Sequence, residues 1–155
     1  MISLRAIAAS ALFLGSAALP SGLLHADIDP NGFVRIQPEE VDWKEAPGTN
    51  GVKTANIYGD QAQPGVYVVR VWFPPGVMSR PHFHPDDRYA VVLKGTWWTG
   101  TGEKFDPPST QPVKTGGFMK HPAREVHYDG AKDEEVVLII TGEGPATNTP
   151  VEMAK

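Results

Sequence analysis

Short apolar runs of the strand type follow one another along most of this chain. From residue 27 onward they alternate with turns rich in proline, glycine and aspartate, and no long stretch shows the 3.6-residue period of an amphipathic helix. The pattern predicts strands at 33–36, 41–45, 52–58, 66–73, 80–84, 88–94, 96–101, 112–114, 117–120, 125–128 and 135–141. The dividing turns include Asp129-Gly130. Many short strands joined by such turns indicate an all-β sandwich or barrel.

Two of the expected strands, 66–73 and 135–141, are apolar at both alternating sets of positions. Such strands are covered on both faces, so they should lie between two layers or between a barrel wall and another subunit. A homodimer is one arrangement that meets this requirement. Residues 103–110 can include one helical turn, and the tail from Gly142 should be an irregular covering segment or a short edge strand.

The first 26 residues have the pattern of a secretory signal. Arg5 supplies the positive start, residues 6–19 are mostly apolar, and Ala26 ends the segment with a small side chain. The alternative is a buried N-terminal helix, but the apolar stretch has no amphipathic face. We therefore expect cleavage after Ala26, a single domain over residues 27–155, and a periplasmic or secreted protein that no longer contacts the membrane.

Charge and composition narrow the classes of partner. The net charge is −4, the chain has no cysteine, and its basic residues are scattered rather than clustered. This balance argues against nucleic acid and anionic membranes and favours a small-molecule ligand. Without cysteine, any metal must be held by histidine, carboxylate or backbone oxygen.

Two histidines one residue apart, His82 and His84, lie in one of the expected strands. Side chains alternate along a strand, so both imidazoles point to one side and can face one metal ion. We interpret His127, at the end of another strand-like run, as the third ligand. Three neutral imidazoles suit one divalent transition metal ion (Fe, Zn, Cu, Mn or Ni) and leave positions open for water and substrate. The alternative is that the histidines are structural or surface residues.

The spacing around the first two histidines resembles the first sequence motif of the cupin superfamily. Gly76, His82-x-His84, Arg88 and Gly95 stand at the motif positions, but most cupins have glutamate where this chain has Arg88. The missing glutamate would have been a fourth ligand, and an arginine cannot ligate a metal.

The stretch around His127 resembles the second cupin motif. Gly116, Pro122 and His127 match it, while Arg124 stands where glycine is common and Ala131 where asparagine often follows. The resemblance implies a double-stranded β-helix, or jelly-roll barrel, with the three histidines as ligands at its mouth. It identifies the chain as a small single-domain exported cupin with a three-histidine site. Some three-histidine cupins are dioxygenases, so the loss of glutamate does not exclude catalysis.

An arginine beside a divalent metal must be balanced by an anion. Arg88 can anchor a carboxylate or enolate of the substrate, or it can pair with Asp86, Asp87 or Glu125 at the barrel rim. We interpret both aspartates as turn residues. His121 can support or replace a ligand, although its place before Pro122 favours a role in the barrel wall.

These residues favour an exported metalloenzyme with oxygenase-like or enolate chemistry. Arg88 would position the substrate, and Tyr89 and Tyr128 are further candidate catalytic residues. One of Trp97 and Trp98 must face inward, where it could line an apolar pocket. A second hypothesis is a binding module without turnover, similar to the cupin-like sensing domain of some anti-sigma factors. A third is a structural barrel with a vestigial site.

Overall fold

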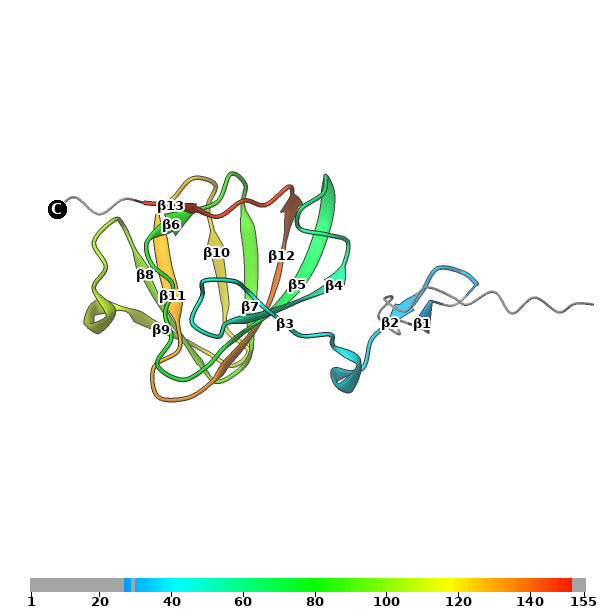
Figure 1. Ribbon diagram of the computed structural model, residues 1–155, viewed down its shortest axis with the longest axis horizontal. Coiled ribbons are helices and arrows are strands. Elements are labelled where there is room, and N and C mark those ends of the chain that lie inside the picture. Colours follow the sequence, from blue (N-terminus) through cyan, green and yellow to red (C-terminus); the bar gives the residue numbers. More distant parts are fainter. Residues whose placement is uncertain (1–26, 29, 152–155) are drawn as a thin grey trace, which may run out of the picture.

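The computed structural model describes residues 27–28 and 30–151, and within them nearly all regular structure is β (Figure 1). One sheet has the strand order β10 (Phe118–His121), β7 (Arg88–Lys94), β12 (Val136–Gly144), β5 (Gly65–Phe73), β4 (Lys53–Tyr58) and β3 (Lys44–Glu45). The other has the order β13 (Thr149–Pro150), β6 (His82–Phe83), β11 (His127–Gly130), β8 (Thr96–Thr101) and β9 (Gln111–Lys114). All pairings within these two sheets are antiparallel.

The two sheets face each other around one hydrophobic core and form the jelly-roll barrel that the sequence predicts. A small hairpin of β1 (Asp27–Ile28) and β2 (Val34–Arg35) lies to the side of the barrel, beyond the 3₁₀ turn η1 (Pro38–Glu40) (Figure 1). Among the described residues, no helix has the length and apolar character needed to cross a membrane.

The core is built from alternate residues of the long central strands. In β5, Tyr67, Val69, Val71 and Phe73 are buried, whereas the residues between them are only half-buried. Strand β12 has the same pattern. Period-two alternation therefore sends one set of side chains into the barrel. The second set, in which Arg70, Thr141 and Glu143 accompany apolar residues, lies on the outer face of the sheet. Of the two adjacent tryptophans, Trp97 is the one that is fully buried.

Several local predictions are confirmed. The expected helical turn is the 3₁₀ turn η2 (Pro107–Ser109), and the tail supplies the short strand β13, which pairs with β6. The pairing matters for the site, because it draws the tail across the barrel next to the histidine strand.

Several expected boundaries are wrong. Strand β6 keeps only two residues of the expected strand at 80–84, and β12 continues to Gly144, past the expected end at 141. The expected strand at 41–45 is only β3, because η1 and an irregular link precede it. Asp129-Gly130, expected as a turn, completes β11 and pairs with Thr99 and Trp98. Gly130 is there for close approach: a Cβ at this position would collide with the backbone of Val77 and Met78.

Candidate metal centre

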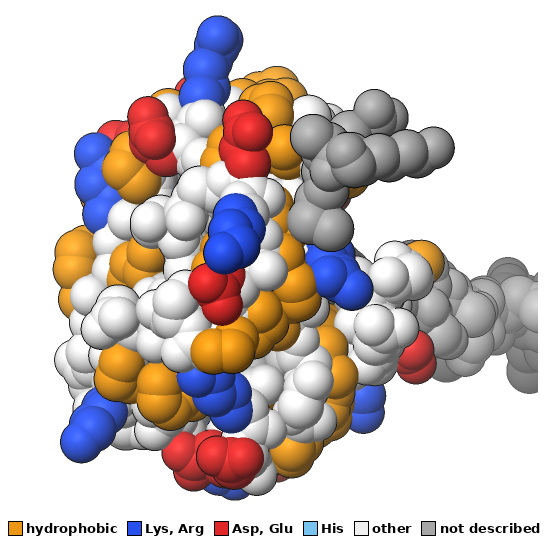
Figure 2. Space-filling view, turned by 90° about the vertical axis from the view of Figure 1, so that its left-hand side faces the viewer, with side chains coloured by type: hydrophobic (Ala, Val, Ile, Leu, Met, Phe, Trp, Pro, Cys, Tyr) orange, Lys and Arg blue, Asp and Glu red, His pale blue; other side chains and the backbone are white. Residues whose placement is uncertain are grey.

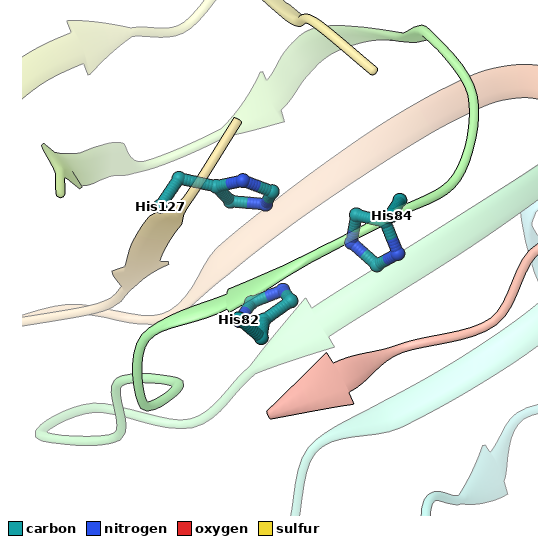
Figure 3. A group of neighbouring side chains, drawn as sticks. All are labelled: His82, His84 and His127. Atoms are coloured by element: carbon teal, nitrogen blue, oxygen red, sulfur yellow. The ribbon is translucent and has the colours of Figure 1, made fainter. Parts of the chain in front are cut away.

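Strands β6 and β11 bring the three predicted histidines together. His82 is the direct pairing partner of His127, and His84 follows β6 on the same side. All three side chains are buried, and each offers a ring nitrogen within 4.8 Å of the others. Figure 3 shows the three rings facing one space. We refer to His82, His84 and His127 as the three-histidine centre.

The three rings have the same hydrogen-bond arrangement on the side away from this space. Nδ1 lies 2.7 Å from the Arg80 carbonyl in His82, 2.8 Å from the Thr147 carbonyl in His84, and 3.0 Å from the Glu125 carbonyl in His127.

A carbonyl oxygen can only accept, so each Nδ1 must carry the proton and donate it. Each Nε2 then carries the lone pair of its ring, which is the form in which histidine binds a metal, although the lone pair of His84 accepts a hydrogen bond from Arg88. The residues present therefore fit a metal ion.

Burial favours the neutral form of two of these imidazoles, His84 and His127. The pKa of His84 is lowered to about 3, first by burial and then by the Arg88 guanidinium. Burial also lowers the pKa of His127. Because metal ligation requires the neutral ring, His84 and His127 stay available as ligands below neutral pH.

Arg88 begins β7 and points into the barrel beside the centre. It pairs directly with His121 of β10, so the two side chains leave the same face of the sheet. One guanidinium nitrogen, NH1, donates to Nε2 of His84, and the buried Nε has no partner. Within the described part of the chain, no carboxylate forms an ion pair with this guanidinium.

None of the predicted rim partners of Arg88, which are Asp86, Asp87 and Glu125, forms an ion pair with it in the described part of the chain. Asp87 lies 2.6 Å from Lys120 Nζ and accepts a 2.8 Å hydrogen bond from the Ala123 amide, which lowers its pKa. It is thus the turn residue that the sequence indicates. The pairing alternative for Arg88 is not what the structure contains, and a positive charge remains in the cavity.

Neither of the two candidate tyrosines lies with the histidines. Tyr89 is exposed on the outer face of the sheet, where its ring stacks on Phe118. Tyr128 follows His127 and so points to the other side of β11, where its hydroxyl lies 3.2 Å from both the amide and the carbonyl of Asp106. Their positions give no support to a catalytic role.

Two other polar residues do lie at the centre. His121 and Asp129 are both buried, and Asp129 Oδ2 is 3.7 Å from Nε2 of His121 and 3.9 Å from Nε2 of His127. The sequence interpretation placed His121 in the barrel wall and missed Asp129. The available signal was the spacing His127-x-Asp129, which has the same period-two logic as His82-x-His84.

A cavity of about 420 Å³ opens onto this group. Its polar wall includes His82, His84, Arg88, His121 and Asp129, and its apolar wall includes Val71, Phe73, Leu138 and Ile140. A volume of this size suits a small organic molecule. The arrangement can hold a cation on imidazole nitrogens and an anion on the guanidinium, a few ångströms apart.

The molecular surface away from the cavity differs in character. Figure 2 shows one face of the protein on which lysines, arginines and carboxylates are interspersed among apolar side chains. No histidine is visible among the described residues of that face, in agreement with the burial of the centre.

Comparison with known proteins assigns the chain to a family. Residues 31–147 match the family model described as the ChrR cupin-like domain. No curated protein matches the sequence significantly.

Solved structures with the same fold are numerous. The polyketide cyclase RemF from Streptomyces resistomycificus matches with a TM-score of 0.64 at 16% identity, over 78% of this chain and 87% of that chain. A sugar phosphate isomerase from the cupin superfamily of Silicibacter pomeroyi gives 0.60 at 16% identity, over 77% and 82%. A cupin-like protein from Thermotoga maritima is 26% identical, with a TM-score of 0.52 over 62% and 74%. These similarities establish the jelly-roll fold.

Proposed function

Because the chain belongs to the ChrR cupin-like domain family, we propose that it is a metal-dependent cupin that acts on a small anionic molecule. One divalent transition metal ion would be held by His82, His84 and His127. The observation that carries the proposal is the common arrangement of the three rings. Each Nδ1 is fixed on a backbone carbonyl, so each Nε2 keeps its lone pair for a ligand bond, and the lone pair of His84 becomes available once Arg88 moves aside.

A metal bound there would supply Lewis-acid or redox chemistry, since three protein ligands leave coordination positions open. Fe, Zn, Cu, Mn and Ni all accept imidazole. The remaining work falls to the protein's own side chains, which bind and orient the ligand.

Arg88 supports an anionic ligand. Its guanidinium is always charged, it is partly buried beside the histidines, and it has no carboxylate partner among the described residues. A carboxylate or enolate would provide the missing negative charge and accept hydrogen bonds from the guanidinium. The apolar wall, with Val71 and Ile140, would contact the uncharged remainder of the molecule and exclude water from it.

A second candidate function is a binding or sensing module without turnover. The observation that favours it is the position of the tyrosines, because neither Tyr89 nor Tyr128 reaches the centre to move a proton. The two functions share the metal and the anion and differ only in turnover.

The experiment that tests the proposal begins with metal analysis of the protein purified from its native compartment. Titration with small carboxylates, phenols and diketones follows, each scored for binding and for oxygen uptake or substrate loss. Metal together with turnover supports the enzyme, and metal with saturable anion binding alone supports the module. A metal-free protein that also fails to take up added Fe, Mn, Cu or Zn contradicts both.

Export is part of the proposal and rests on the sequence alone. The expected signal, residues 1–26, lies outside the described residues. The proposal predicts that the mature protein is found in the periplasm or medium and begins at Asp27, which N-terminal sequencing would establish. A protein that stays inside the cell with its first 26 residues intact contradicts export without affecting the metal site.

A further inference from the structure

His121 is a buried histidine whose ring has no hydrogen-bond partner. Only 3% of the residue is exposed, and neither Nδ1 nor Nε2 meets a donor or acceptor. Its ring stacks on that of His127, with centroids 3.8 Å apart, and Trp97 covers it from another side. Burial lowers its pKa to about 2, so the ring is neutral. Burying a polar ring without hydrogen-bond partners is unfavourable, which indicates that a ligand binds a nitrogen of His121.

Asp129 provides the oxygen that faces this ring. The residue is 6% exposed and belongs to β11. Its backbone is fixed on both sides by Ser79, whose Oγ accepts from the Asp129 amide at 2.9 Å and whose amide donates to the Asp129 carbonyl at 2.7 Å. The backbone that carries the carboxylate is therefore fixed, and the Asp129 side chain lines the cavity.

Two of the separations between these ligand atoms fall in the range found around a single ion. Bonds of about 2.0–2.2 Å to nitrogen and oxygen put two ligand atoms on the same metal roughly 3.2–4.2 Å apart. The Asp129 oxygen is 3.7 Å from Nε2 of His121 and 3.9 Å from Nε2 of His127. Each of the three residues offers a ligand atom within 4.8 Å of the others. Because the rings of His121 and His127 are stacked at 22°, the unpartnered His121 ring must turn about its side-chain torsions to direct its lone pair at the same ion.

We propose that His121, His127 and Asp129 form a second binding position for a divalent transition metal ion, beside the three-histidine centre. Two imidazoles and one carboxylate are a donor set that suits Fe(II) and related ions with open coordination positions. Asp129 would thereby supply the carboxylate ligand that is missing from the first cupin motif, where Arg88 stands in place of the usual glutamate.

The two positions share a ligand and cannot be filled together. Nδ1 of His127 is occupied by the Glu125 carbonyl, so only its Nε2 is free, and that single lone pair serves one ion at a time. The chain consequently holds one ion in total, at one position or the other. The second position does not depend on the first being functional.

The test uses the full chain, stripped of metal and titrated with Co(II), whose visible bands report ligand geometry. The wild type should bind one equivalent. The variant His82→Ala/His84→Ala, which lacks the three-histidine centre, should still bind one equivalent, with no more than a hundredfold loss of affinity. Adding Asp129→Asn to it should weaken binding at least a further hundredfold. Adding Asp42→Asn, a change at an exposed carboxylate, should not.

Opposite outcomes separate this proposal from the proposed function. A folded His82→Ala/His84→Ala variant that binds no Co(II), or one whose affinity Asp129→Asn leaves unchanged, overturns the second position while the three-histidine centre stands. If the His82→Ala/His84→Ala variant binds Co(II) as tightly as the wild type, and the single variant Asp129→Asn loses binding, the second position is supported and the three-histidine centre is contradicted.

If the double variant does not fold, wild-type crystals soaked in Co(II) decide instead. Anomalous density among His121, His127 and Asp129 supports the proposal. Density confined to the three-histidine centre overturns it.

Discussion

Arg88 occupies the position at which the first cupin motif usually has a glutamate ligand. Its guanidinium donates to Nε2 of His84, the lone pair that a metal at the three-histidine centre would need. The side chain cannot lose its charge, so it repels a cation and must move aside when one binds. Under the proposed function the same charge would draw an anion to the metal, so we expect this one residue to weaken metal binding and strengthen ligand binding.

Exchanging this residue should reverse both effects. Arg88→Glu is expected to raise the affinity of the metal-free protein for Zn(II) at least tenfold, about 1.4 kcal/mol, because it removes a repulsive charge and adds a ligand. Affinity for small carboxylates should fall by a similar factor. Isothermal titration calorimetry measures both. Lys114→Glu, an equal change of charge at an exposed position of β9, should change neither, and unchanged affinities in Arg88→Glu would contradict the assigned role.

The sequence predicts individual site residues when a simple period places them. His82 and His84 could be put on one side because alternation in a strand is local. Asp129 was missed because Asp-Gly is a common turn signal, whereas these residues continue the strand through their pairing with Thr99 and Trp98 of β8. Tyr89 and Tyr128 were candidates because they adjoin the motifs, yet neighbours in a strand face opposite sides.

At the scale of elements, turns with a positive φ restrict the sequence as strongly as the buried strands do. The long strands β5, β7, β8 and β12 could be predicted closely from apolar runs bounded by proline and glycine. The short elements β3 and β6 were less predictable, because pairing with distant strands, not local pattern, defines them. The motif position Arg124 has φ of 65°, which explains why glycine is common there in cupins.

Two turns offer a matched pair of glycines, Gly95 between β7 and β8 and Gly76 between β5 and β6. Gly95 has φ of 78°, and a Cβ there would collide with the Glu135 carbonyl, whereas Gly76 has φ of 79° with open space around it. Gly76→Ala should cost about 1–2 kcal/mol for the left-handed backbone alone. Gly95→Ala should cost about 3 kcal/mol or more, because the backbones must also separate. Urea unfolding of both variants measures the difference, and equal losses would show that the contact is unimportant.

At the scale of the whole molecule, the outer face of the larger sheet is unusually apolar. Tyr58, Val66, Tyr89, Leu93 and Phe118 are all exposed hydrophobic residues of its strands. The homodimer that the sequence indicates remains a prediction, and this face is where we expect the second copy to pack.

Sedimentation velocity tests the dimer across a range of concentrations. Phe118→Glu should convert a wild-type dimer to a monomer, because it places a charge in the apolar contact. Lys114→Glu, on the smaller sheet, should leave the mass unchanged. A wild-type protein that is monomeric at all concentrations contradicts the prediction.

Metal binding should also be visible in the stability of the whole domain. The ligands are brought together only by long-range pairing of β6 with β11, so the unfolded chain lacks the site and the metal stabilises the fold. A metal concentration of 100 times Kd should add about 2.7 kcal/mol and raise the thermal midpoint by roughly 10 °C, and a chelator should reverse the shift. His127 is the ligand common to both proposed positions, so His127→Ala should abolish the shift whichever position is filled, while Lys114→Ala keeps it. A His127→Ala protein that folds and still gains the full stabilisation would place the metal elsewhere on the chain.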